Sequence, residues 1–136
     1  MLDKYYFGKV DRISPEAPVP IVNIQKEESR LGGASNVANN IVSLGGHSLL
    51  CGVIGHDLFG KEIERISRHK NIDTFLLKTS SPTITKARII GGKQQIVRVD
   101  YEDKSELNAD NKKLFRDTIS RISVSYTHLT LPTKLE

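Results

Sequence analysis

The chain has 136 residues, of which 38% are hydrophobic and 26% charged, and its net charge at pH 7 is +4. This composition is ordinary for a globular protein with a modest core. No apolar run is long enough to span a bilayer, and the first residues do not resemble a signal peptide. The mild positive charge suits an anionic small molecule as well as nucleic acid, and no basic run with interleaved aromatic residues favours nucleic acid. We expect neither a membrane nor a nucleic acid as partner.

Cysteine and histidine give no sign of a metal site. Cys51 lies in the apolar run Leu49–Ile54, so we predict a buried side chain, no disulfide and a cytoplasmic location. The histidines lack the spacing of metal ligands and are interpreted as incidental: His47, His56, His69 and His128.

The first predicted elements are extended. An aromatic stretch, Tyr5–Gly8, precedes the proline-rich stretch Ser14–Pro20. Proline fixes φ and cannot donate to a β-ladder, so the proline-rich stretch is predicted to be extended and to lie at an edge. A short strand is predicted over Ile21–Ile24.

A helix is predicted from about Ser35 to Leu44, because Val37, Ile41 and Leu44 recur at helical spacing before two glycines. The nearly continuous apolar run Leu49–Ile54 is typical of a parallel strand that is covered on both faces.

A second helix is predicted to begin at Asp57, which is a suitable N-cap, and to end near Asn71. A strand over Ile72–Leu77 follows. The inner face of this helix is expected to hold Phe59, Ile63 and Ile66.

Strands that alternate with helices indicate a doubly wound α/β fold. After these elements, two alternating runs, Pro82–Ile90 and Ile96–Tyr101, flank a pair of glycines and predict a β-hairpin. A third helix is predicted over about Asn108–Ile122, with its inward side formed by Phe115, Ile119 and Ile122.

A spaced series of glycines and polar residues is the most informative feature of the chain. It comprises Gly32-Gly33-Ala34-Ser35-Asn36, then Gly45, then Gly55-His56-Asp57-Leu58-Phe59-Gly60. Paired glycines before a helix let a ligand approach the backbone, and an asparagine amide offers a polyol both donors and an acceptor. The alternative is a glycine-rich strand–helix turn of some other α/β fold.

The series resembles the N-terminal signature of the PfkB (ribokinase-like) carbohydrate kinases. This resemblance implies a ribokinase-like doubly wound sheet with a small β lid, present here only in part. The predicted hairpin matches that lid, a small sheet that covers the sugar in these enzymes. Longer motifs are similar to the heptose 7-phosphate kinase branch of the family: Met1–Tyr5, Arg12–Pro20, Pro82–Arg88 and Gln94–Asp100.

Enzymes of that branch use MgATP to phosphorylate D-glycero-β-D-manno-heptose 7-phosphate at its anomeric hydroxyl, for lipopolysaccharide core synthesis. In many bacteria the kinase is fused to a nucleotidyltransferase that makes ADP-heptose. The resemblance implies that Asp3 accepts hydrogen bonds from sugar hydroxyls, and that Gly32, Gly33 and Asn36 form the turn that contacts the sugar.

By the same resemblance, the substrate's 7-phosphate would be bound by Lys86, Arg88 and Arg98, since a phosphate needs cationic donors. The alternative is a solvated face of the hairpin. Strand periodicity places Lys86 and Arg88 on one face, whereas the position of Arg98 depends on a register that the turn glycines do not determine.

The resemblance covers residues 1–123, and residues 124–136 resemble nothing in the family, so we expect a partial kinase domain followed by a foreign tail. The family's Gly-Ala-Gly-Asp turn, which holds the general base, does not occur in the chain. We therefore expect no catalytic residue here, no confident MgATP binding, and no activity of this portion alone.

Other functions stay open. One is a PfkB kinase for another sugar, such as ribose, fructose phosphate or a nucleoside, and another is a non-catalytic module that binds a sugar phosphate. The resemblance also implies a homodimer formed through the lid.

Overall fold

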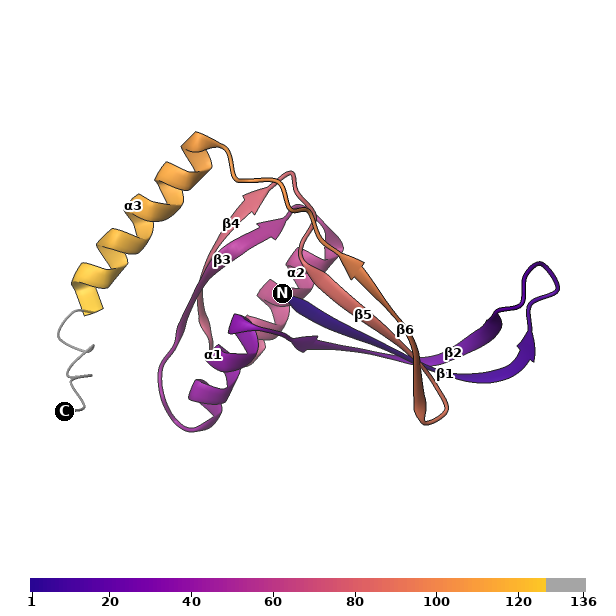
Figure 1. Cartoon of the computed structure of the whole chain (residues 1–136). Coiled ribbons are helices and arrows are strands. Elements are labelled where there is room, and N and C mark those ends of the chain that lie inside the picture. The colour runs from indigo at the N-terminus through magenta and orange to yellow at the C-terminus, as the bar shows by residue number, and fades with distance from the viewer. Residues whose placement is uncertain (127–136) are drawn as a thin grey trace, which may run out of the picture. The chain divides into compact units, whose positions relative to one another are not determined.

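A computed structural model describes residues 1–126, and the chain divides into two compact units, Met1–Asp103 and a second that begins at Lys104 (Figure 1). In the second unit, α3 spans Ala109–Tyr126, which confirms the third predicted helix. From residue 127 onward, the predicted foreign tail lies outside the described residues. None of the helices described is long and apolar enough to cross a membrane.

The first unit contains a four-stranded sheet in the order β2-β1-β5-β6. The strands are β1 (Leu2–Ile13), β2 (Pro20–Leu31), β5 (Thr85–Gly91) and β6 (Gln94–Tyr101). β1 pairs antiparallel with β2 and parallel with β5, and β5 and β6 form the predicted hairpin. The prediction of a short strand over Ile21–Ile24 was too narrow, because these residues belong to the twelve-residue β2.

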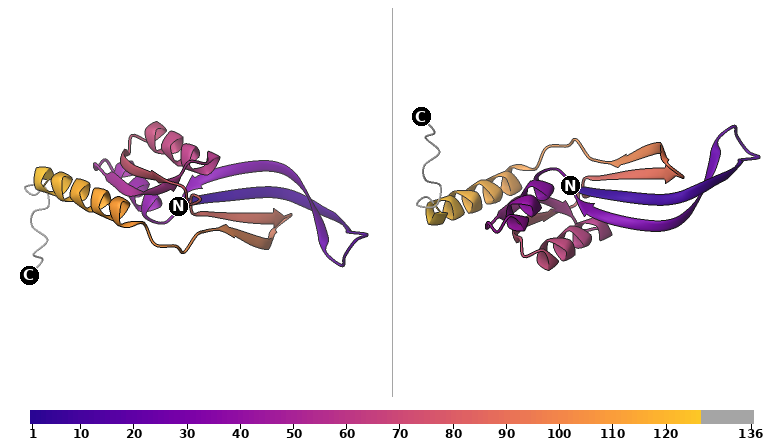
Figure 2. Two further views of the ribbon diagram at one scale, coloured as in Figure 1. Left: turned by 90° about the horizontal axis from the view of Figure 1, so that it is seen from above. Right: turned by 90° about the horizontal axis from the view of Figure 1, so that it is seen from below.

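The outer halves of β1 and β2 form a two-stranded arm. β1 pairs with β5 only as far as Gly8, so the segment Lys9–Asn23 continues beyond the hairpin as the arm (Figure 2). The prediction of an extended edge for Ser14–Pro20 was wrong. Instead, the segment closes the arm, with the backbone N–H of Ser14 donating to the Val19 carbonyl at 2.9 Å.

A parallel βαβ unit holds the core. It consists of β3 (Leu49–Gly55), α2 (Leu58–His69) and β4 (Asp73–Thr79). The predicted inner face of α2 is confirmed, because Ile63 and Ile66 are buried and Phe59 packs against them. Burial of both faces of β3 is not found among the described residues, since Ile54 is buried whereas Val53 is 37% exposed.

Cys51 on β3 is half-buried rather than fully buried, and this burial raises the pKa of its thiol. A raised pKa keeps the thiol neutral and unreactive. The side chain therefore acts as a small apolar group, as predicted.

The first predicted helix is present as α1 (Ala34–Ser43), but its apolar repeat does not mark its buried side. Val37 and Ile41 are 57% and 42% exposed, whereas Ser35 and Ala38 are buried. The Ser35 hydroxyl donates to the carbonyls of Met1 and Gly32, at 3.1 and 2.7 Å. These bonds turn the small-residue side of the helix toward the first strands.

Asp57 joins the βαβ unit to the segment that leads into β5, and we call this contact the Asp57–Thr83 junction. As predicted, Asp57 caps α2, accepting from the Gly60 N–H at 2.8 Å. Its carboxylate also accepts from the Thr83 N–H at 2.8 Å and from the Thr83 hydroxyl at 2.6 Å. The Thr83 hydroxyl in turn accepts from the Gly55 N–H at 2.8 Å.

Close packing at the junction explains the two motif glycines beside Asp57. A Cβ on Gly55 would lie 2.5 Å from the Ser81 carbonyl oxygen, and one on Gly60 would lie 2.5 Å from the Gly55 carbonyl oxygen. Both contacts are with backbone, which cannot move aside cheaply. The Gly-x-Asp-x-x-Gly motif is thus a packing solution at this junction.

We expect Asp57→Ala to lower the free energy of unfolding by roughly 2–3 kcal/mol, through loss of the helix cap and of the partners of buried Thr83. Urea denaturation measures this change. The control is Asp73→Ala, at an exposed carboxylate, which we expect to change stability by less than about 0.5 kcal/mol. Equal effects of the two variants would contradict this account.

The stabilisation by Asp57 depends on pH. Burial alone raises the pKa of Asp57, but hydrogen bonds from Thr83 and Gly60 outweigh it and hold the pKa below its ordinary value. A group whose pKa is lowered by folding stabilises the fold above its unfolded pKa, about 4, and loses this effect as the pH falls through the folded pKa. The stability difference between wild type and Asp57→Ala should therefore shrink below about pH 4.

Candidate functional site

One face of the four-stranded sheet gathers four of the predicted site residues. Residues paired across neighbouring strands share a face. Asp3 pairs with Lys86, Tyr5 with Arg88, and Arg88 with Arg98. The register therefore places Arg98 beside Arg88, which the sequence alone left open. We call this surface the cationic face; its members are Asp3, Tyr5, Glu28, Arg30, Lys86, Arg88, Arg98 and Asp100.

The opposite face of the sheet is occupied by α2. The rings of Phe59 on α2 and Tyr101 on β6 lie 5.3 Å apart between centroids. A pocket lined by Lys4 and Tyr6 of β1 is bounded on its other side by α2 residues, among them Glu62. The cationic face is thus the side of the sheet that points away from α2.

Asp3 and Arg88 form an ion pair in the middle of the cationic face. Arg88 Nη1 donates to Asp3 Oδ1 at 2.8 Å, and the two side chains are 23% and 18% exposed. The hydrogen bond to Asp3 raises the pKa of the Arg88 guanidinium, so the group is fully charged. Asp3, which is predicted to accept from sugar hydroxyls, and Arg88, which is predicted to bind the phosphate, therefore bind each other in this structure.

The other two predicted phosphate ligands differ in their availability. Arg98 holds Asp100 through two hydrogen bonds, at 2.8 and 3.0 Å. The Lys86 side chain, by contrast, makes no ion pair or hydrogen bond with any residue that the structure describes. The Lys86 ammonium group is therefore available to an anion without first losing a protein partner.

Arg30 and Tyr5 also belong to this site, although neither was predicted from the sequence. The guanidinium carbons of Arg30 and Arg88 lie 4.7 and 5.3 Å from the centroid of the Tyr5 ring, within cation–π range. Phe7 stacks beside Tyr5, at 6.0 Å between ring centroids. The alternation of Asp3, Tyr5 and Phe7 along one strand was the available signal.

The paired glycines serve the site in different ways. A Cβ on Gly32 would lie 2.5 Å from Asp3 Oδ2, so the space beside Gly32 is filled by the Asp3 carboxylate. Gly33 has φ +56°, in the left-handed region that favours glycine, and it is the N-cap of α1. In this structure the first glycine accommodates a protein carboxylate, and the second supplies the turn.

Asn36 lies in the first turn of α1 and is exposed. It lines a pocket of about 460 Å³ together with Arg30 and Asn39. Its side chain makes no hydrogen bond to Asp3 or Arg88. The structure thus connects Asn36 to the cationic face through Arg30, which lies in both.

No metal centre occurs in the described part of the chain: within residues 1–126, no three His, Cys, Asp or Glu side chains come together to hold an ion. The chemistry offered by the cationic face is recognition by charge and hydrogen bonds. Its guanidinium and ammonium groups suit a phosphate, and its carboxylate suits hydroxyl groups.

The family model for pfkB family carbohydrate kinases matches residues 5–135. The bifunctional protein HldE of Nitratiruptor sp. is 45% identical over 126 residues, covering 93% of this chain and 27% of that protein. The D-beta-D-heptose 7-phosphate kinase of Bordetella bronchiseptica is 50% identical over 107 residues, covering 78% of this chain and 34% of that protein. The chain thus spans about a quarter to a third of the length of these relatives.

Solved structures show the same fold at low identity. Phosphofructokinase-2 from Escherichia coli, in its tetrameric inhibited form, matches with a TM-score of 0.66 at 18% identity, covering 89% of this chain and 38% of that chain. A putative phosphofructokinase from Staphylococcus aureus matches with a TM-score of 0.67 at 16% identity, covering 87% of this chain and 36% of that one. These likenesses establish the ribokinase-like architecture of the chain, present in part.

Gly32→Ala should displace the Asp3 carboxylate and lower the free energy of unfolding by roughly 1–3 kcal/mol, because the new Cβ overlaps Oδ2. In an Asp3→Ala background the same change should cost less, since the carboxylate is gone and only the end of the flexible Met1 side chain, 2.8 Å from the new Cβ, must move. Thermal and urea unfolding of the wild type, the two single variants and the double variant measure this coupling.

The matched control is Gly52→Ala, where the nearest atom to the new Cβ is 3.7 Å away. We expect little change in stability there. Additive effects of Gly32→Ala and Asp3→Ala would show that the carboxylate does not need the space beside Gly32.

Proposed function

The chain belongs to the pfkB family of carbohydrate kinases, and on that premise we propose that it is the sugar-binding and lid portion of a heptose 7-phosphate kinase. The substrate would be D-glycero-β-D-manno-heptose 7-phosphate, phosphorylated at its anomeric hydroxyl in the route to ADP-heptose and the lipopolysaccharide core. Relatives at 45% and 50% identity that bear the names HldE and heptose 7-phosphate kinase support this substrate. Because ATP is the phosphoryl donor, we place the enzyme in the cytoplasm.

The observation that carries the proposal is the register that puts Lys86, Arg88 and Arg98 on the same sheet face as Asp3. A phosphorylated sugar has two kinds of group to recognise. Its phosphate suits the three cations, and its hydroxyls suit the carboxylate. An unphosphorylated sugar would leave Lys86 without a ligand, and Arg88 and Arg98 paired with Asp3 and Asp100.

Binding of the substrate would exchange partners within the face. A phosphate at Lys86 would compete with Asp3 for Arg88 and with Asp100 for Arg98. Release of Arg88 would leave the Asp3 carboxylate, beside Gly32, able to accept from sugar hydroxyls. Gly33 and Asn36 would add contacts at the start of α1.

The residues of this chain do not fit MgATP. The sequence has no Gly-Ala-Gly-Asp turn, whose backbone N–H groups and aspartate would serve the transferring phosphoryl and the sugar hydroxyl. We therefore assign no step of phosphoryl transfer to these residues, and propose that this portion alone is inactive. Its part in the reaction is to bind and orient the sugar phosphate.

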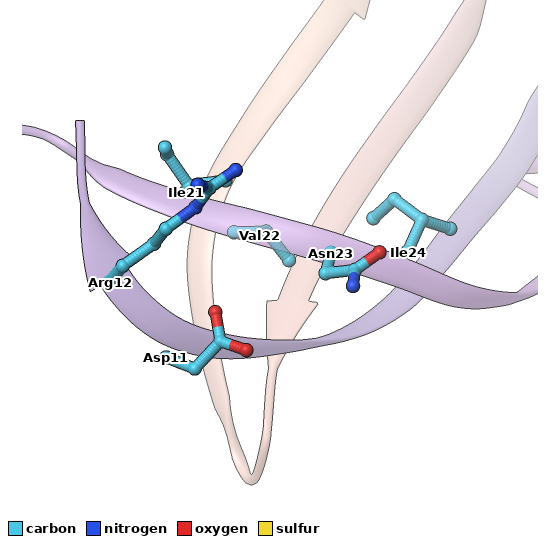
Figure 3. Close-up of a pocket in the computed structure, with 6 residues that line it drawn as sticks. All are labelled: Asp11, Arg12, Ile21, Val22, Asn23 and Ile24. Carbon is cyan, nitrogen blue, oxygen red and sulfur yellow. The ribbon is translucent and has the colours of Figure 1, made fainter. Parts of the chain in front are cut away.

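The arm, Lys9–Asn23, is proposed to pair with the arm of a second copy. A lone two-stranded ribbon is marginally stable in water, and this one exposes Val10, Ile13 and Val19 by 40–61%. Its pocket is lined by Asp11 and Arg12 on β1 and by residues 21–24 on β2 (Figure 3). Neighbouring opposite charges allow a self-complementary contact between two identical arms.

The substrate is tested with the full-length enzyme of the locus that encodes this chain. We expect ATP turnover that depends on heptose 7-phosphate, with kcat/KM lower by about a hundredfold or more for the unphosphorylated heptose, because two or more charged hydrogen bonds are lost. A preference for an unphosphorylated sugar or another sugar phosphate would contradict the proposal.

Lys86→Ala should raise KM for heptose 7-phosphate by about tenfold in the same assay, through loss of one charge-assisted hydrogen bond. The control is Lys93→Ala, at an exposed lysine in the turn of the hairpin. Equal KM values for the two variants would show that Lys86 does not bind the substrate's phosphate.

Ile13→Asp, in the arm, should shift the protein from dimer to monomer, because it places a charge in an apolar contact. Sedimentation velocity measures the mass. The control is Leu58→Asp, at an apolar side chain that is 78% exposed outside the arm. A dimer that survives Ile13→Asp, or a wild-type monomer, would contradict this contact.

A further inference from the structure

The Asp57–Thr83 junction lies directly before the strand that carries the cations. Thr83 is two residues before the first residue of β5, Thr85, and three before Lys86. Between them, the Ile84 carbonyl accepts from the Leu2 N–H at 2.9 Å, beside Asp3 on β1. The position of Thr83 therefore determines where β5 begins against β1.

The Asp57–Thr83 junction is buried and tightly packed. Thr83 and Thr85 are 1% and 0% exposed, and the Thr85 hydroxyl donates to the Thr83 carbonyl at 3.1 Å. Both oxygens of the Asp57 carboxylate accept hydrogen bonds from Thr83. The turn on the other side is held by Gly55 and Gly60, where a Cβ would meet backbone oxygen at 2.5 Å.

We propose that Asp57 and Thr83 are positioning residues for the substrate's phosphate. They hold the start of β5 in one place, and through it the side chains of Lys86 and Arg88. The inference rests on the proposed function and extends it to residues that the site does not contain. Neither residue is on the cationic face, so their effect passes through the backbone.

The effect should fall on affinity. The Lys86 side chain makes no hydrogen bond or ion pair among the described residues, so its position depends on the strand that carries it. Groups that act on the anomeric hydroxyl are proposed to lie outside this chain. Loosening the junction should therefore weaken phosphate binding while it leaves the chemical step nearly unchanged.

The test compares Thr83→Val with Thr83→Ser in the full-length enzyme. Valine removes the hydroxyl that joins Asp57 to Gly55, whereas serine keeps it. We expect Thr83→Val to raise KM for heptose 7-phosphate by about tenfold with kcat within about twofold, since small misplacements of binding groups are costly. Thr83→Ser should keep KM for heptose 7-phosphate near the wild-type value. Neither substitution should change KM for the unphosphorylated sugar.

Thr79→Val is the matched control, because it makes the same change at a buried threonine whose hydroxyl has only a long contact, 3.5 Å, to the Ile54 carbonyl. Asp57→Asn is the second variant, should Thr83→Val not fold. It keeps one acceptor oxygen but turns an amide donor toward the junction, so KM should again rise. A KM that stays unchanged in both variants, or rises equally in Thr79→Val, would overturn the inference.

Amide hydrogen exchange of the 136-residue chain separates this inference from the proposed function, because it needs no ligand. Exchange over residues 85–89 should accelerate in Thr83→Val and stay unchanged in Thr79→Val. If the wild-type enzyme fails to use any sugar phosphate, the proposed function fails and this exchange pattern still supports the positioning of β5. Unchanged exchange in Thr83→Val would overturn that positioning.

Discussion

The parallel pairing of β1 with β5 is the constraint on which the rest of this structure depends. Residues 85 positions apart in sequence, Asp3 and Arg88, meet only because Asp3 pairs in register with Lys86. Parallel neighbours need a long crossover connection, and here that connection includes β2, α1 and the whole βαβ unit. The site is therefore made by the topology of the first unit, and no single segment contains it.

The Asp57–Thr83 junction is where this crossover returns to the sheet. It fastens the last step before β5 to the start of α2, with hydrogen bonds of 2.6–2.8 Å to one carboxylate. Closing the long connection between β1 and β5 costs conformational entropy. The buried hydrogen bonds of the junction, in which each polar group has a partner, favour a single closed conformation of that connection. The Gly-x-Asp-x-x-Gly motif thus supports the cationic face without belonging to it.

The ion pairs of the cationic face allow a phosphate to replace a carboxylate as the partner of an arginine. Arg88 is paired with Asp3 and Arg98 with Asp100, whereas Lys86 has no partner among the described residues. The Arg98–Asp100 pair is partly exposed, so opening it costs little. The Arg88–Asp3 pair is mostly buried, so it can open only if both groups gain new partners. A phosphate on Arg88 and sugar hydroxyls on Asp3 would supply these partners.

Much of this could be predicted from local sequence patterns. Caps and turns such as Asp57 and Gly91-Gly92 act through neighbours in the chain, and the elements they bound are found as expected. The apolar repeat of Val37, Ile41 and Leu44 predicts the helix correctly but not its buried side. The hydrogen bonds of Ser35 orient α1 instead. Alternation along β1 places Tyr5 on the same face as Asp3, whereas the membership of Arg30 in the site follows from the β1–β2 register, which no local pattern reveals.

Chemical-shift mapping of the ¹⁵N-labelled chain with heptose 7-phosphate tests most directly whether the cationic face binds the sugar phosphate. The account predicts saturable shifts at Asp3, Lys86, Arg88 and Arg98, with Lys4 and Tyr6 on the α2 side unchanged. Inorganic phosphate should reproduce the shifts at the cations but not at Asp3. Shifts confined to the α2 side or the arm, or no shifts at millimolar ligand, would contradict the account.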